Sequence, residues 1–306
     1  MNLTIGVCAF NEGRNIKTLL NDILSQEGLP GTSSVIVVAS GCTDDTTGVV
    51  REVMRDNPKI RLIEEENRSG KATAINRILA MRPGGLVMLV DADTRVPRNS
   101  VMEVVREFSD EKIGVVGALP IVDNTDSGAV AKSAAIIWRV MTQAMSELSP
   151  RDELSFVMGE LYCFRTSILQ SIPADIVNDD AYIATFARSK GFKVVIAPQA
   201  RFVTKVPSSI PDYLAQRRRV IFGHRLIKAR TGRYATSMEG IALNHTWALV
   251  RATIREAASH PTSIIRALLI LELEAIAGLL AWLDRKNGKQ HVLWKRVETT
   301  KRSATS

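Results

Sequence analysis

The sequence predicts an α/β protein with a mixed, mainly parallel sheet flanked by helices, followed by a C-terminal helical region. Apolar strand-like runs alternate with helical patterns through the first half of the chain, as they do in βαβ units. Several of these runs are apolar throughout, which is typical of strands covered on both faces. The 306 residues, 45% of them hydrophobic, can also bury a full core.

The first half of the chain contains five strand-like runs. They cover Leu3–Ala9, Val35–Ala39, Ile60–Glu64, Leu86–Val90 and Ile113–Leu119. Between the first two runs, apolar residues recur at spacings of three and four and predict an amphipathic crossover helix: Ile16, Leu19, Leu20, Ile23 and Leu24. Further helices are expected to begin near Asp44 or Asp45 and near Asn99, because these residue types cap helix N-termini.

After residue 120 the pattern changes to longer helices and fewer strands. The expected elements are a helix at about 126–148, a strand at 156–165, a helix at about 179–190 and a strand at 194–197. Gly191 is expected to end the helix at about 179–190, because glycine adopts the left-handed conformation at little cost. From Pro211 onward the pattern is entirely helical.

The charge of the chain is concentrated in its last third. Residues 201–306 contain 19 Lys and Arg and 7 Asp and Glu, which gives them a net charge of +12. Since the whole chain has a net charge of +8, the first 200 residues have a net charge of −4. Such a basic region suits nucleic acid, anionic lipid or a phosphorylated substrate. Only 5% of residues are aromatic and no nucleic-acid-binding motif is found, so nucleic acid is not an expected partner.

The cysteines and the N-terminus predict a cytoplasmic protein. Cys8, Cys42 and Cys163 are odd in number and irregular in spacing, which indicates neither a disulfide framework nor a zinc site. The chain runs from Met1 directly into a strand-like segment, without the features of an export signal.

The C-terminal region, 233–306, is expected to be a basic amphipathic helical region that serves as a membrane-interface or homo-oligomerisation element. Residues 264–283 are nearly apolar, but Glu272 and Glu274 disfavour a transmembrane span, since each would cost about 2.5 to 3.5 kcal/mol at the bilayer centre. Peripheral contact with an anionic cytoplasmic membrane face and an ordinary packing helix with a solvated tail remain alternatives. The residue types of a lipid headgroup boundary follow: Trp282, Arg285, Lys286, Lys289, Trp294, Lys295 and Arg296.

Two carboxylates, Asp91 and Asp93, stand at the end of the fourth strand-like run. Ligands of open α/β sheets bind beyond the carboxyl ends of such strands, so the pair lies where chemistry is expected. Two carboxylates separated by one small residue suit Mg²⁺ or Mn²⁺, which keep positions open for nucleotide phosphates. Two solvated turn carboxylates are the alternative interpretation of these residues alone.

Three more polar segments follow parallel strands and are therefore expected at the same edge of the sheet. A nucleotide placed there would use Phe10 as a platform, Ser40 or Glu12 for base or ribose, and Lys71 or Arg68 for the diphosphate. For each residue alone, a turn or helix start is an equally good explanation.

The ordered set of these segments resembles glycosyltransferase family 2, which has the Rossmann-like GT-A fold, and the resemblance covers about residues 1–230. The matching segments are Ala9-Phe10-Asn11-Glu12, Val38 to Asp44, Gly70-Lys71-Ala72-Thr73-Ala74-Ile75-Asn76, Asp91-Ala92-Asp93, Asp179-Asp180 and Gln216 to Val220. The family implies a GT-A catalytic domain, placed here at 1–232, that moves one sugar from a nucleoside diphosphate sugar to a hydroxyl acceptor, glycan or lipid-linked, with inversion.

The resemblance also implies roles for individual residues. Asp93 would hold Mn²⁺ or Mg²⁺ on the donor diphosphate, and Asp91 would face the ribose, the sugar or a metal-bound water. Asp180 would be the general base for the acceptor hydroxyl, with Asp179 orienting it; helix capping by 178–180 is the alternative. Gln216 and Arg219 would contact the donor, whereas Arg217 and Arg218 are expected to be solvated and the lone His224 structural.

Two departures from the family pattern limit what can be transferred. Ala39-Ser40 replaces the carboxylate that contacts the base, so uridine is only the default nucleoside. Val220 replaces a tryptophan, and no array of apolar spans follows, which favours a single-addition enzyme. A sugar nucleotidyltransferase is a rival, but the loop at Phe10–Arg14 is acidic and has one glycine. A non-catalytic scaffold with the same fold is the other rival.

Overall fold

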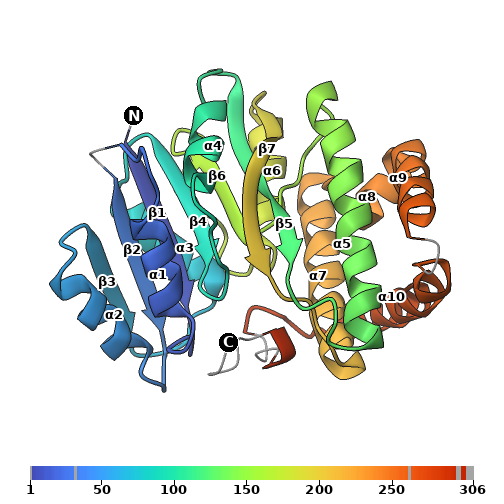
Figure 1. The fold of residues 1–306 in the computed structure, drawn as a ribbon, viewed down its shortest axis with the longest axis horizontal. Coiled ribbons are helices and arrows are strands. Elements are labelled where there is room, and N and C mark those ends of the chain that lie inside the picture. Colours follow the sequence, from blue (N-terminus) through green and yellow to red (C-terminus); the bar gives the residue numbers. More distant parts are fainter. Residues whose placement is uncertain (1, 31–32, 261–262, 294–297, 301–306) are drawn as a thin grey trace.

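A seven-stranded mixed sheet forms the centre of the protein (Figure 1). The computed structural model describes residues 2–30, 33–260, 263–293 and 298–300. The strands lie in the order β3-β2-β1-β4-β6-β5-β7. Their bounds are β1 Leu3–Ala9, β2 Ser34–Ser40, β3 Ile60–Glu65, β4 Leu86–Asp91, β5 Ile113–Val122, β6 Leu161–Arg165 and β7 Lys193–Thr204.

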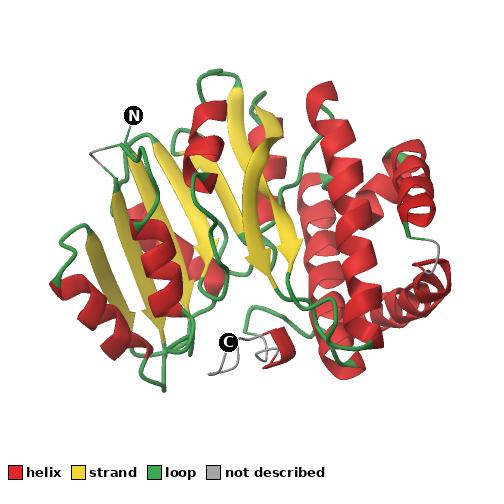
Figure 2. Cartoon of the chain, viewed as in Figure 1, coloured by secondary structure: helices red, strands yellow, loops and turns green. Residues whose placement is uncertain are grey.

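Strand direction places the carboxyl ends of six strands, all but β6, at one edge of the sheet. β1 pairs in parallel with both β2 and β4, and β2 pairs in parallel with β3. β6 runs antiparallel to β4 and β5, while β5 and β7 are parallel to each other. The predicted mixed, mainly parallel sheet is thus confirmed (Figure 2). Because β6 is reversed, its beginning lies at the edge where β1, β2 and β4 end.

Helices cover both faces of the sheet and extend beyond one end of it. α1, α2 and α4 lie on one face and α3 and α6 on the other, while α5 and α7 to α10 gather beyond β5 and β7 (Figure 1). Their bounds are α1 Ile16–Leu24, α2 Thr46–Arg55, α3 Lys71–Ala80, α4 Ser100–Glu107, α5 Ala129–Leu148, α6 Asp179–Ser189, α7 Ile210–Thr231, α8 Met238–Asn244, α9 Thr246–Ser259 and α10 Ser263–Lys286.

The apolar patterns produce the core as expected. The side chains of Ile16, Leu19, Leu20 and Ile23 are all buried on the inner face of α1, and β4 is buried along its apolar run. These contacts remove large apolar surface from water, at about 25 cal/mol for each Å². Gly191 has a φ of 84° and ends α6 as predicted.

Two of the later elements differ from the prediction. The strand expected at 156–165 comprises only Leu161–Arg165, and residues 156, 158, 159 and 160 instead line a cavity. The strand expected at 194–197 is longer, Lys193–Thr204, because shifts in register let it follow β5 along its length. The helix α3 begins at Lys71, where no helix was predicted.

The C-terminal helices are joined to α5 and α7 by ion pairs. Arg217 lies 2.6 Å from Glu274, and Arg218 pairs with Asp284, of which only 4% is exposed. The expectation that Arg217 and Arg218 are solvated is therefore wrong, because α10 packs along α7 and supplies a carboxylate for each. Within the described ranges, none of the helices combines the length and apolar character that crossing a bilayer requires.

Candidate active site

A cavity of about 340 Å³ opens at the edge where β1, β2 and β4 end. The eleven residues predicted as catalytic, nucleotide-sugar-binding or metal-binding all line it, although they come from six separate parts of the chain. They are Ala9, Phe10, Glu12, Ser40, Lys71, Asp91, Asp93, Asp179, Asp180, Gln216 and Arg219.

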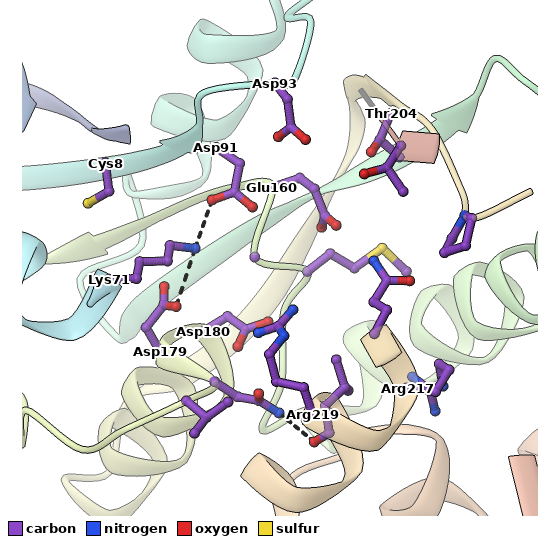
Figure 3. A pocket seen from close by; sticks show the side chains of 18 of the residues that line it. Cys8, Lys71, Asp91, Asp93, Glu160, Asp179, Asp180, Thr204, Arg217 and Arg219 are labelled. Carbon is purple, nitrogen blue, oxygen red and sulfur yellow. Dashed lines mark hydrogen bonds and ion pairs between the residues drawn. The ribbon is translucent and has the colours of Figure 1, made fainter. Parts of the chain in front are cut away.

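Lys71 joins the two acidic pairs of the cavity (Figure 3). Its Nζ lies 2.8 Å from Asp91 and 3.2 Å from Asp179. Burial alone would lower the pKa of Lys71, but Asp179 and Asp91 together raise it well above its ordinary value. The ammonium group therefore stays charged and holds the end of β4 and the start of α6 together.

Asp91 and Asp93 differ in their surroundings. Burial raises the pKa of Asp91, and Lys71 partly offsets this effect. Asp93 comes from the turn after β4, and its carboxylate points into the cavity rather than toward Lys71 (Figure 3). The Asp93 carboxylate thus faces the space that a ligand would occupy, and Asp91 is paired with Lys71.

Asp179 and Asp180 are the first two residues of α6, and their carboxylates make different contacts. Asp179 is buried, accepts a hydrogen bond of 2.7 Å from the Tyr162 hydroxyl and pairs with Lys71. Asp180 accepts a 2.7 Å hydrogen bond from the backbone N–H of Ala181, and its carboxylate points into the cavity (Figure 3). Burial, followed by the charge of Asp179, raises the pKa of Asp180 to about 7.

Helix capping does not explain the whole acidic start of α6. Asn178 occupies the N-cap position but makes no side-chain capping bond, and its amide instead donates to the Val220 carbonyl of α7 at 3.0 Å. The carboxylate of Asp179 is directed to Lys71 and Tyr162. Only Asp180 bonds to the helix backbone, and it does so with one oxygen.

Glu160 is an acidic cavity residue that the sequence analysis did not identify. Its carboxylate points into the space between Asp93 and Asp180 (Figure 3), and its carbonyl accepts a hydrogen bond from Asp91 N at 3.1 Å. Burial, followed by the charge of Asp91, raises the pKa of Glu160 to about 8. An acidic residue directly before an apolar run was the available signal, but it points to this edge only if β6 is antiparallel.

The end of the cavity for which a nucleotide was predicted is built by turns after β1, β2 and β3. The Arg68 guanidinium lies over the Phe10 ring, 3.8 Å from its centroid, so the predicted platform is already stacked by a cation. Gly41 allows this approach, since its φ is 63° and a Cβ there would lie 2.4 Å from Arg68 N. Ser40 Oγ accepts from Ser69 N at 3.1 Å, and Glu12 accepts from the Asn15 amide at 2.6 Å.

The opposite wall is formed by α7. Gln216 and Arg219 line the cavity, and so does Arg217, which pairs with Glu274 of α10. Burial lowers the pKa of Arg219, and the acidic residues of the cavity oppose this effect. His224 is buried against Phe156, and burial lowers its pKa to about 3, which fits the structural role expected of it.

A second part of the cavity is apolar. One side of α5 and the start of α8 supply this wall, which the sequence analysis did not predict. Its residues are Ala134, Ile137, Trp138, Met141 and Met238. The cavity therefore has a charged half at the strand ends and an apolar half between helices.

A divalent cation fits the charged half only together with a ligand. Among the residues that the structure describes, no three His, Cys, Asp or Glu side chains are grouped so as to hold a metal ion by themselves. Mg²⁺ and Mn²⁺ sites that work on nucleotides use one or two carboxylates and complete their coordination with phosphate oxygens and water. Asp93, with Asp91 beside it, supplies that donor set.

This fold and this cavity define a nucleotide-sugar glycosyltransferase of the GT-A class: a Rossmann-like half that ends in Asp91 and Asp93, and a separate acidic pair across the cavity. The family model described as "Glycosyltransferase like family 2" matches residues 2–223. The chain belongs to this family.

Individual relatives are more distant. The chain is 22% identical over 220 residues to poly-β-1,6-N-acetyl-D-glucosamine synthase of Staphylococcus aureus, covering 70% of this chain and 52% of that protein. It is 26% identical over 143 residues to β-monoglucosyldiacylglycerol synthase of a Nostoc species, covering 44% and 31%. The chain thus spans about half the length, or less, of these curated relatives.

Among solved structures, a mannosyltransferase from Pyrobaculum calidifontis in complex with GDP-Man and Mn²⁺ has the same fold. The TM-score is 0.67 at 23% sequence identity, and the match covers 94% of this chain and 88% of the other. This similarity confirms the GT-A fold predicted for the chain.

Proposed function

We propose that this glycosyltransferase is metal-dependent and inverting, and that it transfers one sugar from a nucleoside diphosphate sugar to a hydroxyl of an acceptor that is lipid-linked or a glycan. The observation that carries the proposal is the separation of two acidic pairs by one lysine, Lys71, whose side chain is 18% exposed. Asp93 and Asp91 lie at the leaving-group end, and Asp180 and Asp179 lie at the acceptor end. Direct displacement needs both ends.

Asp180 is the group that takes the acceptor proton. The acceptor oxygen bonds to the anomeric carbon as the bond from that carbon to the diphosphate breaks, and the hydroxyl proton passes to Asp180. Attack from the face opposite the leaving group inverts the anomeric centre. A pKa of about 7 suits this role, because a base is most effective when its pKa lies near the working pH.

Asp93, with Asp91, would hold Mn²⁺ or Mg²⁺. The cation would neutralise charge on the departing diphosphate. Asp179 and Lys71 act by position: Lys71 fixes Asp179, and Asp179 raises the pKa of its neighbour Asp180. Arg219, on the wall of α7, is placed to meet negative charge in the cavity.

The donor base is left to experiment, with uridine as the default. Ser40 stands where the family has a carboxylate, and the mannosyltransferase with the same fold was solved with GDP-Man. Membership of glycosyltransferase family 2 excludes the sugar nucleotidyltransferase considered from the sequence. The scaffold alternative is disfavoured because the cavity keeps both acidic pairs.

Nucleotide-dependent stabilisation tests the proposal. UDP, GDP, ADP and CDP are each titrated with Mn²⁺ or Mg²⁺ while thermal unfolding is followed, with Asp93→Asn as the matched variant. A ligand at a hundredfold excess over its Kd stabilises by about 2.7 kcal/mol. We expect one base to stabilise the wild type only when the cation is present, and the variant much less. If no nucleotide stabilises the wild type more than the variant, the proposal is wrong.

A further inference from the structure

The outer faces of α9 and α10 carry two exposed apolar stripes. On α8 and α9 the stripe consists of Leu243, Trp247, Val250 and Ile254, at spacings of three and four, and Trp247 is 73% exposed. On α10 it consists of Leu268, Leu271, Ile276, Leu279, Trp282 and Leu283. Large apolar surfaces of this kind on a folded chain mark an interaction site.

Packing inside the protein does not account for these stripes. The other faces of the same helices already make the internal contacts: Ala248 and Ala252 of α9 are buried, as are Leu273 and Ala277 of α10. Both helices lie at the end of the molecule farthest from β3 (Figure 1). The stripes therefore face outward on two amphipathic helices whose inner sides already pack against the rest of the protein.

The exposed charges that α8 to α10 themselves carry are almost all positive. Among the described residues of 238–293, Arg255, Arg285, Lys286 and Lys289 are exposed, whereas Glu272 is the single exposed carboxylate. The remaining carboxylates of this stretch are buried or half-buried and face Arg139, Arg217, Arg218 and Arg225. An apolar face bordered by cations matches an anionic bilayer surface.

A groove next to the α10 stripe has the same chemistry. It runs between α7 and α10 and is lined by Arg225, Tyr234, Gly278, Leu279, Trp282 and Arg285. Lys286 lies 4.2 Å from the centroid of the Trp282 ring, and Lys228 lies 4.1 Å from that of Tyr234. Aromatic rings beside cations are typical of side chains at the depth of lipid headgroups.

A second copy of the chain fits this face less well. Two copies that met through it would bring eight exposed cations together with two exposed carboxylates, since each copy contributes four and one. An anionic bilayer would instead neutralise the cations and cover the apolar side chains. The predicted headgroup residues Trp294, Lys295 and Arg296 lie outside the described residues.

We infer that the α8–α10 face docks on an anionic lipid bilayer. The helix α8 connects this face to the catalytic cavity, because Met238 at its start lines the apolar half of the cavity and Leu243 at its end is 64% exposed. An acceptor held in the bilayer would therefore enter the apolar half of the cavity alongside α8. This last step rests on the proposed function, whereas the docking itself does not.

Vesicle binding tests the docking. The wild-type protein is sedimented with vesicles of phosphatidylcholine, with or without phosphatidylglycerol. Leu271→Glu/Leu279→Glu changes two outward residues that are 63% and 57% exposed, so the fold is expected to persist. We expect binding to mixed vesicles to fall by about 100-fold. The matched control, Met81→Glu/Ile121→Glu, changes residues 46% and 45% exposed elsewhere and is expected to bind like the wild type.

A second pair of variants tests the charge. Arg285→Gln/Lys286→Gln is expected to weaken binding to phosphatidylglycerol vesicles by about 25-fold, about fivefold for each cation, and added salt should have a similar effect. Lys59→Gln/Arg61→Gln removes two exposed cations at β3 and should change little. Equal binding of the wild type to neutral and anionic vesicles would overturn the proposal.

Three further results would also overturn it. The first is that the wild type does not bind the vesicles. The second is that Met81→Glu/Ile121→Glu loses as much binding as Leu271→Glu/Leu279→Glu. The third is that neither the wild type nor Leu271→Glu/Leu279→Glu binds vesicles, while sedimentation velocity without vesicles shows a wild-type dimer that Leu271→Glu/Leu279→Glu dissociates. Nucleotide-dependent thermal stabilisation, measured on the same variants, is expected to be unchanged. Its loss in the wild type would count against the proposed function and not against the docking.

Discussion

Asp179 and Asp180 are neighbours in sequence, yet replacing each by asparagine is expected to change stability in opposite directions. Asp179 is buried, lies 3.2 Å from Lys71 and accepts from Tyr162. Breaking a buried ion pair from one side costs about 3 kcal/mol or more. Asp179→Asn should therefore destabilise the protein by about that amount.

Asp180→Asn should stabilise it at neutral and alkaline pH. Burial and Asp179 raise the pKa of Asp180 from 3.8 to about 7. Between these values the folded state binds more protons than the unfolded state, so wild-type stability falls as the pH rises. At about 1.4 kcal/mol for each pKa unit, the total is about 4 kcal/mol. Asparagine does not ionise, so the variant should gain up to this amount above pH 7 and almost nothing near pH 4.

Urea unfolding across this pH range, together with product formation, measures both effects. Activity of Asp180→Asn should fall by about 10² to 10⁴, the usual contribution of a general base, while its stability rises. A protein that gains stability and loses activity cannot owe the loss to misfolding. The reasoning is refuted if Asp180→Asn is less stable than the wild type at pH 8, or if it keeps activity within tenfold.

Three other changes have defined outcomes. Burial lowers the pKa of His224 to about 3, so below pH 6.5 this side chain gains a proton when the protein unfolds. The free energy of unfolding of the wild type should therefore fall by up to about 5 kcal/mol as the pH falls from 6.5 toward 3. In urea titrations, His224→Phe should show a smaller loss of stability over this pH range. Glu274→Gln leaves Arg217, whose side chain is only 18% exposed, without its counter-charge and should cost about 3 kcal/mol in the same assay. Glu52→Gln, in an exposed pair with Lys17, should change little. Lys71→Met removes a charge that lowers the pKa of Asp180, so the rise of kcat with pH should move above pH 7. Lys71→Arg should keep the wild-type pH profile of kcat. If the pH profile of Lys71→Met is the same as that of the wild type, the role given to Lys71 is wrong.

Much of the site was predictable because its signals are local. Asp91 and Asp93 follow an apolar run, and Phe10 and Ser40 lie at or just beyond the ends of two others, so strand direction alone brings them to one edge. The start of α6 was marked by its own carboxylates. The parallel strands β1, β2 and β4 could be assigned for the same reason, since their apolar runs are buried along almost their whole length.

The parts that were not predicted depend on contacts between distant segments. Glu160 reaches the cavity because β6 runs antiparallel, and the apolar pattern of residues 156–165 does not encode direction. Arg217 and Arg218 find their carboxylates 57 and 66 residues later, on a helix whose packing against α7 no local pattern specifies. The apolar wall from α5 has the spacing of an ordinary core-facing helix, and only the tertiary structure shows that part of it faces a cavity.

The same helix, α10, has two functions in this arrangement. On one side Glu274 binds Arg217 and Tyr213, both of which line the cavity, and Asp284 binds Arg218. On the other side its apolar stripe forms the proposed docking face. Because buried ion pairs lose much of their stability when one partner is displaced, α10 cannot shift along α7 without disturbing the cavity wall. A bilayer that binds the outer side of α10 would therefore hold the cavity at a fixed height and orientation above the lipid, which is what an enzyme acting on a membrane-held hydroxyl requires.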